Sequence, residues 1–227
     1  MTEADKRSQG PDKDTSSVPS HLVGIGASAG GLEALKQLFK PMPIDSGMAF
    51  VIVQHQSPEF ESLTATLLAQ VTAMPIVLVD EAVEIRANHI YLSHPGRSLA
   101  IDDHHLIAPD VPKPQGPPTT IDGFLRSLAR HWGDKSIAIL LSGCGRDGAV
   151  GVMEVHNIGG LVLAQDASAA YQDMPRNAVA TGCVDLRLAA KDMAKALLTY
   201  LNRARAPTDY RLPEQPPMEG VPAIFDA

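Results

Sequence analysis

The fold is decided by residues 21–35, His21-Leu22-Val23-Gly24-Ile25-Gly26-Ala27-Ser28-Ala29-Gly30-Gly31-Leu32-Glu33-Ala34-Leu35. A short apolar run ends in a glycine-rich turn, and leucines then recur with helical spacing. The pattern predicts a strand, a tight turn and a helix. Because the turn follows the carboxyl end of a strand, it lies where open α/β sheets bind their ligands. Its backbone N–H groups begin a helix and lack helical partners, so they are available to a ligand.

One hydroxyl group, that of Ser28, stands in the middle of this turn. Either the turn binds a phosphate, or Ser28 is a nucleophile beside the N–H groups of Ala29 and Gly30, which would stabilise an oxyanion. The spacing Gly24-x-Gly26-x-x-Ala29 fits the dinucleotide-binding fingerprint. That fingerprint needs an acidic residue about 20 positions further on, at the end of the second strand. The chain has Gln54-His55-Gln56 there, which favours the nucleophile.

Composition excludes several classes of function. The 227 residues are 44% hydrophobic but only 4% aromatic, so the core must be aliphatic, as in a parallel sheet between helices. A formal net charge of −7 argues against a general nucleic-acid binder. No apolar run approaches the roughly 20 residues of a membrane span, and the N-terminus lacks a signal-peptide pattern. Two cysteines are too few for a disulfide framework, so we expect a cytoplasmic protein without membrane insertion.

The chain divides into three segments. Residues 1–20 are polar and lack apolar periodicity, which predicts a disordered leader, and residues 205–227 form a Pro-rich tail or linker. Strands and helices alternate within residues 21–204. This alternation predicts a doubly wound α/β domain, with a mostly parallel sheet, helices on both faces and a short antiparallel hairpin. We also expect a helix that begins at Ser57-Pro58 and an extended loop over residues 109–118.

Three polar residues share one place in this topology. Ser28 follows the first strand, His55 follows the second, and Asp147 lies in the glycine-rich turn after the strand at 136–141. A serine nucleophile requires a base, and the base requires a carboxylate that fixes its tautomer. Each residue alone is also explained as a helix cap or a loop hydrogen-bonding residue. Their joint placement favours a catalytic triad, with Asp166 as the reserve candidate for the acid.

Other polar residues carry less weight. Asp102-Asp103-His104-His105 fits a solvated hairpin tip better than a metal site, and we expect neither a metal nor a cofactor. Cys144 has no His or Lys neighbour in sequence, so we expect it to line the site without acting as a nucleophile. Arg97 and Arg176 are candidate contacts to an acidic substrate surface, and are equally well explained as partners of surface carboxylates.

Four motifs follow one another along the chain: Gly24-Ile25-Gly26-Ala27-Ser28-Ala29-Gly30-Gly31, Val53-Gln54-His55, Leu141-Ser142-Gly143-Cys144-Gly145-Arg146-Asp147-Gly148-Ala149 and Met174-Pro175-Arg176-Asn177-Ala178-Val179-Ala180-Thr181-Gly182-Cys183-Val184-Asp185. Together they resemble the catalytic domain of the chemotaxis receptor methylesterases, the CheB family, from about Leu22 to Leu201. The resemblance implies hydrolysis of glutamate methyl esters on chemoreceptors, and some members also deamidate glutamines. It places the nucleophile, base and acid on Ser28, His55 and Asp147. The implied partners are a methylated chemoreceptor or related signalling protein, and a separate response regulator or methyltransferase.

The chain departs from the family pattern in a few places. Ala29 stands where Thr is common, and Cys144 stands where Met or Thr is usual. Members usually carry an N-terminal receiver domain, whereas residues 1–20 here resemble only a polar leader, so we expect no phosphorylation control in cis. The turn is similar to that of the modules fused to a methyltransferase. Two alternatives stay open: a catalytically silent interaction module, and a nucleotide- or phosphate-binding Rossmann-like domain.

Overall fold

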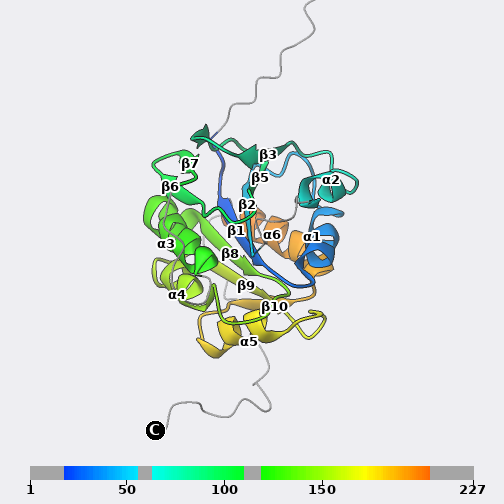
Figure 1. Ribbon diagram of the computed structural model, residues 1–227. Coiled ribbons are helices and arrows are strands. Elements are labelled where there is room, and N and C mark those ends of the chain that lie inside the picture. Colours follow the sequence, from blue (N-terminus) through cyan, green and yellow to red (C-terminus); the bar gives the residue numbers. More distant parts are fainter. Residues whose placement is uncertain (1–17, 56–62, 110–118, 205–227) are drawn as a thin grey trace, which may run out of the picture.

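The computed structural model describes residues 18–55, 63–109 and 119–204 (Figure 1). Several expectations fall wholly or mostly outside these ranges. They are the disordered leader, the helix start at Ser57-Pro58, the extended loop over 109–118 and the Pro-rich tail.

The main sheet consists of seven strands: β1 (Leu22–Ala27), β2 (Ala49–Gln54), β3 (Ile76–Val79), β5 (Ile90–Ser93), β8 (Ser136–Leu140), β9 (Leu161–Gln165) and β10 (Leu186–Leu188). They lie in the order β10-β9-β8-β1-β2-β5-β3, and all the neighbouring pairs are parallel. A small antiparallel sheet contains β4 (Val83–Glu84), β7 (His105–Ile107) and β6 (Ala100–Asp102). The predicted doubly wound sheet and hairpin are confirmed. The short strands β4 and β10 were not predicted.

Helices cover both faces of the main sheet. The aliphatic core on one face includes residues of α1 (Gly31–Phe39), α2 (Thr64–Leu68) and α6 (Ala190–Ala204). The core on the other face includes residues of α3 (Thr120–Trp132), α4 (Ala149–Asn157) and α5 (Asp173–Ala180), and a 3₁₀ turn at Gly133–Lys135 follows α3. Figure 1 shows α1 and α6 on one side of the sheet and α3 and α4 on the other. The described part of α2 begins at Thr64, and Leu63, the residue directly before it, is exposed.

The glycines of β1 allow α3 to pack directly on the sheet. A Cβ atom on Gly24 would lie 2.9 Å from side-chain atoms of Leu125 and Leu128, and one on Gly26 would lie 2.6 Å from Ile121. These residues belong to one face of α3. The packing of α3 against β1 therefore explains why glycines stand at positions 24 and 26. This explanation removes most of the support for a dinucleotide-binding fingerprint. The same packing brings the N-terminus of α3 to the carboxyl end of β1.

The chain order places a switch point between β1 and β8. From β1 the sheet grows through β2 to β5 and β3 in one direction, and through β8 to β9 and β10 in the other. In open α/β sheets the crevice outside the carboxyl ends of the strands at such a point binds the ligand. Ser28 follows β1, His55 follows β2 and Asp147 follows β8. The fold therefore assembles the three predicted residues at this edge.

Candidate active site

Ser28 opens a tight turn into α1. Its N–H donates to the Ser142 carbonyl at 3.0 Å, and the Gly31 N–H donates to the Ser28 carbonyl at 2.9 Å. Gly30 has φ 72° and ψ −2°, the values of the third residue of a type II turn, which glycine adopts without strain. The N–H groups of Ala29 and Gly30 have no acceptor among the described residues, and both residues are at least partly exposed. The turn thus offers two free donors next to a serine.

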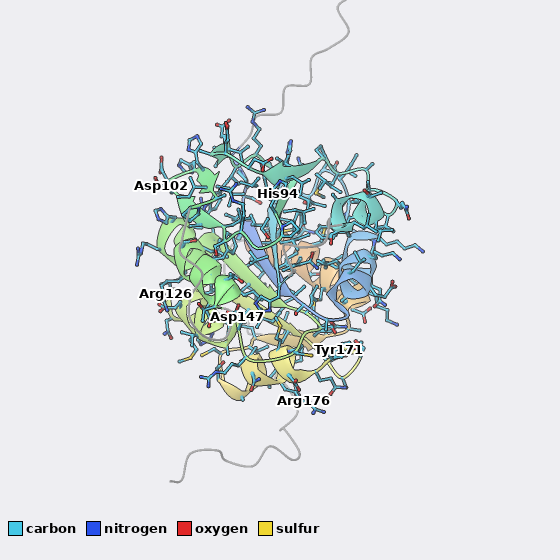
Figure 2. All side chains as sticks on the ribbon, viewed as in Figure 1. His94, Asp102, Arg126, Asp147, Tyr171 and Arg176 are labelled. Carbon is cyan, nitrogen blue, oxygen red and sulfur yellow. The ribbon has the colours of Figure 1, made fainter. Side chains whose placement is uncertain are left out.

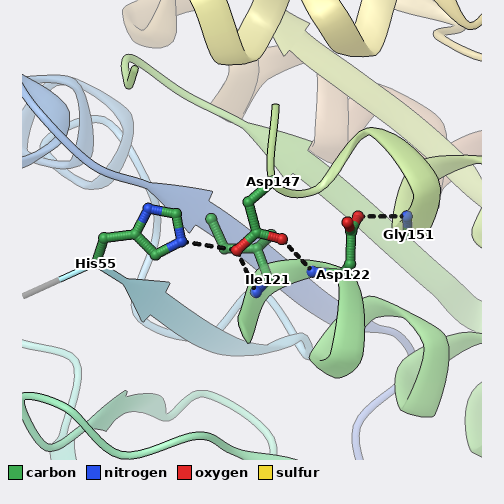
Figure 3. Close-up of polar contacts among 5 residues, drawn as sticks. All are labelled: His55, Ile121, Asp122, Asp147 and Gly151. Carbon is green, nitrogen blue, oxygen red and sulfur yellow. Dashed lines mark hydrogen bonds and ion pairs between the residues drawn. The ribbon is translucent and has the colours of Figure 1, made fainter. Parts of the chain in front are cut away.

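His55 and Asp147 form the central polar contact of this edge. His55 Nε2 lies 2.7 Å from Asp147 Oδ2, and the Asp147 side chain is only 3% exposed (Figure 3). A carboxylate only accepts hydrogen bonds, so Nε2 carries the proton of this contact, and Nδ1 is left as the ring nitrogen that is free to act as a base. Asp166 makes a different contact: its Oδ1 accepts the Ser168 N–H at 2.9 Å. The structure therefore pairs His55 with Asp147, the first candidate for the acid.

Ser28 and His55 lie at matching positions on neighbouring strands. The register pairs Ala27 with Gln54, so the two following residues leave adjacent parallel strands side by side, with backbones roughly 4.8 Å apart. No hydrogen bond joins the Ser28 hydroxyl to the His55 ring in the described structure. Such contacts are often long in sites without substrate. The catalytic role of the three residues therefore stays a prediction, which the fold makes geometrically reasonable.

The N-terminus of α3 holds the Asp147 carboxylate. Oδ2 also accepts the Ile121 N–H at 3.0 Å, and Oδ1 accepts the Asp122 N–H at 2.9 Å (Figure 3). Thr119, the residue at the N-cap position, makes no side-chain cap. Asp147 therefore caps α3 from a distant part of the chain, at the helix end that carries the positive partial charge. The same carboxylate orients His55 and completes a helix.

Asp122, a residue of α3, caps the start of α4 in the same way. Its Oδ1 accepts the Gly151 N–H at 2.8 Å (Figure 3). Burial raises the pKa of the Asp122 carboxyl above its ordinary value of 3.8; the Gly151 N–H lowers it, and the Asp147 charge raises it further. Sequence reasoning missed this residue. The available signal, Thr119 three positions before Asp122, is a capping-box spacing and predicts a local cap instead of a contact to another helix.

The three residues predicted to contact the substrate differ in how free their side chains are. Cys144 is exposed in the loop after β8, and Arg176 is exposed on α5. Arg97 lies beside His94, and its guanidinium donates to the Asp80 carbonyl at 3.3 Å. Figure 2 shows His94 well apart from Asp147. Arg97 is thus engaged within the chain, and its role towards a substrate stays a prediction.

The described residues hold no group of three or more His, Cys, Asp or Glu side chains that could bind a metal. Asp103 and His104 form the tip of the β6–β7 hairpin and are exposed, as expected of a solvated turn. Among these residues there is also no helix long and apolar enough to cross a membrane.

The fold and site together define a class of protein: a parallel α/β domain in which a serine turn, a histidine and a buried carboxylate meet at one sheet edge. The chain belongs to the CheB methylesterase family, which it matches over residues 23–197. The crystal structure of the Thermotoga maritima CheB methylesterase catalytic domain superposes with a TM-score of 0.73 at 26% identity. The match covers 81% of this chain and 100% of that one.

Curated relatives give the same result. A protein-glutamate methylesterase/protein-glutamine glutaminase from Photorhabdus laumondii is 32% identical over 190 residues, which is 82% of this chain and 54% of the relative. One from Burkholderia pseudomallei is 33% identical over 186 residues, 79% of this chain and 50% of the relative. An uncharacterised 104.1 kDa protein from Rhodobacter capsulatus is 38% identical over 141 residues, 61% of this chain and 15% of that protein. The chain spans about half the length of the methylesterases that it matches.

Proposed function

We propose that this chain is a cytoplasmic serine esterase that hydrolyses glutamate γ-methyl esters on a chemoreceptor or related signalling protein. The observation that carries the proposal is the 2.7 Å contact between His55 Nε2 and Asp147 Oδ2 beside the Ser28 turn. The names of the Photorhabdus and Burkholderia relatives support both the ester substrate and a second activity, the deamidation of glutamine.

In the proposed reaction, His55 Nδ1 takes the proton of the Ser28 hydroxyl as its oxygen attacks the ester carbonyl. Asp147 stabilises the imidazolium that forms, while the N–H groups of Ala29 and Gly30 donate to the oxyanion. The proton then passes from His55 to the departing methoxide, and methanol leaves an acyl-Ser28 ester. A water molecule, activated by the same ring, attacks this ester and releases the glutamate carboxylate and free Ser28.

The proposed substrate surface lies around the loop after β8 and the start of α5. Cys144 and Arg176 are exposed there, and Tyr171, which lies two residues before α5, is 50% exposed. In this proposal, a glutamate ester on a receptor helix reaches Ser28 across this surface. The matched segment is 15% of the uncharacterised Rhodobacter relative, so a similar domain occurs there within a longer chain. A methyltransferase or response regulator is the partner we propose.

The test is methanol release from a synthetic helical peptide that carries one glutamate γ-methyl ester. Wild-type protein should release methanol, and Ser28→Ala should lower kcat by about 10³-fold or more while the variant stays folded. Labelling with a fluorophosphonate, which reacts covalently with activated serines, gives a readout that does not depend on the peptide. A folded protein that neither releases methanol nor becomes labelled at Ser28 is the silent interaction module. Thermal stabilisation by a nucleotide would instead support the phosphate-binding alternative.

A further inference from the structure

Ser142 connects the nucleophile turn to the end of β9 and to the loop that follows it. It is 1% exposed and directly follows Leu141 at the carboxyl end of the β8 segment. Its carbonyl accepts the Ser28 N–H at 3.0 Å, and its own N–H donates to Gln165 Oε1 at 2.9 Å. Its hydroxyl oxygen lies 2.7 Å from the Ala29 carbonyl and 3.0 Å from the Tyr171 nitrogen. Every polar group of this buried serine is therefore occupied.

The direction of the hydroxyl proton follows from its partners. The Tyr171 N–H can only donate, so Ser142 Oγ accepts from it. The Ala29 carbonyl can only accept, so the hydroxyl proton points at the Ala29 oxygen. The resulting chain of hydrogen bonds runs from Tyr171 through Ser142 to the peptide group between Ala29 and Gly30.

That peptide group is the central one of the type II turn. Type I and type II turns share their end residues and differ mainly by a flip of this central peptide. Glycine in the third position accepts both forms, because it tolerates φ near +80° and near −90°. The sequence of the turn therefore does not choose between them at Gly30. In a trans peptide the N–H points opposite to the C=O, so holding the Ala29 carbonyl against Ser142 directs the Gly30 N–H to the exposed side.

We infer that Ser142 is a positioning residue, whose hydroxyl holds the Ala29–Gly30 peptide in the type II orientation so that the Gly30 N–H faces the oxyanion. The inference rests on the proposed function, which makes this N–H an oxyanion donor. Without the hydroxyl, the central peptide is free to flip and to present the Ala29 carbonyl where the donor stood. A carbonyl oxygen there repels the negative charge of the transition state.

The test compares Ser142→Ala with Ser136→Ala. Ser136 lies at the other end of β8, is fully buried, and donates to the Leu128 carbonyl at 3.1 Å, so its variant loses a similar bond away from the site. We expect Ser142→Ala to lower kcat for the ester peptide by about 10²-fold, as when one oxyanion donor is removed, with little change in KM. Ser136→Ala should leave both constants near wild type. Ser142→Thr restores a hydroxyl and should recover most of kcat.

A second measurement reads the turn without activity. In a type II turn the Ala29 Hα lies close to the Gly30 N–H, so isotope-labelled wild-type protein should give a strong NMR cross-peak between them. The cross-peak should weaken in Ser142→Ala and persist in Ser136→Ala. If Ser142→Ala keeps both the cross-peak and kcat while Ser28→Ala is inert, the role of Ser142 is overturned and the proposed function stands. If wild type releases no methanol, the proposed function fails, and an unchanged cross-peak in Ser142→Ala then overturns the positioning role as well.

Discussion

Replacing Asp147 with asparagine should damage both the reaction and the fold. Both carboxylate oxygens accept from donors only: the His55 ring, the Ile121 N–H and the Asp122 N–H. In the asparagine variant one of these positions becomes an NH₂ group, which is itself a donor. If the amide replaces Oδ1, the Asp122 N–H loses its acceptor. If it replaces Oδ2, His55 must move its proton to Nδ1, the nitrogen that has to act as the base.

The size of both effects follows from these contacts. A buried N–H left without an acceptor costs about 1–3 kcal/mol, and the loss of a negative charge at a helix N-terminus adds about 0.3–1 kcal/mol. A loss of about 2–3 kcal/mol lowers the Tm of a domain of this size by roughly 4–12 °C. The wrong tautomer and the missing charge should lower kcat by about 10³- to 10⁴-fold.

The assay combines methanol release with thermal unfolding followed by circular dichroism, and Asp166→Asn is the matched control. The Asp166 carboxylate accepts a local N–H from Ser168, a bond that an asparagine oxygen keeps. We expect near wild-type activity and a Tm within about 2 °C for the control, as for most surface changes. If Asp166→Asn loses more activity than Asp147→Asn, our assignment of the acid is wrong. An unchanged Tm in Asp147→Asn would refute the cap on α3.

Three further predictions test the surrounding residues. His55→Gln should lower kcat about as much as Ser28→Ala, and the double variant should be little worse because the two residues act as one unit; additive losses in kcat would contradict this. The raised pKa of Asp122 means that its ionisation opposes folding above pH 3.8, so urea unfolding should show Asp122→Asn gaining stability relative to wild type as pH rises towards 7. A pH-independent difference would refute that sign. Arg176→Ala should raise KM for an acidic ester peptide about two- to fivefold, the change expected from the loss of one exposed ion pair. Arg97→Ala should change KM less, because the Arg97 guanidinium already donates to a backbone carbonyl. Equal KM values in both variants and wild type would exclude both arginines from the substrate surface.

The sequence predicts the sheet and the meeting of His55 with Asp147 because both depend on simple geometry. Apolar runs bounded by turn residues predict parallel strands, and residues that follow such strands share one edge of the sheet. The short strands β4 and β10 could not be predicted, because two or three residues are too few to show an alternation of apolar and polar side chains.

Asp122 and Ser142 could not be predicted, because their roles arise between segments distant in sequence. From the sequence, Asp122 is only a polar residue in the first turn of a helix, and its contact with Gly151 depends on how α3 and α4 pack. Ser142 is only a residue at the end of a strand, and its contact with Ala29 joins residues 113 positions apart. Local pattern also left the glycines of β1 ambiguous. Only the position of α3 shows that they serve packing.

The cap that Asp147 provides explains why this acid need not weaken the fold. Many active sites hold charged groups that destabilise the native state, and activity is then gained at the expense of stability. Here the Asp147 carboxylate, which orients His55, also accepts two N–H groups at the N-terminus of α3. Asp122 of α3 in turn accepts an N–H group at the N-terminus of α4. The stability of two helices and the position of the acid therefore depend on the same contacts. Substitutions at Asp147 should lower activity and Tm together, whereas Ser28→Ala, whose side chain supports no helix in this way, should lower activity alone.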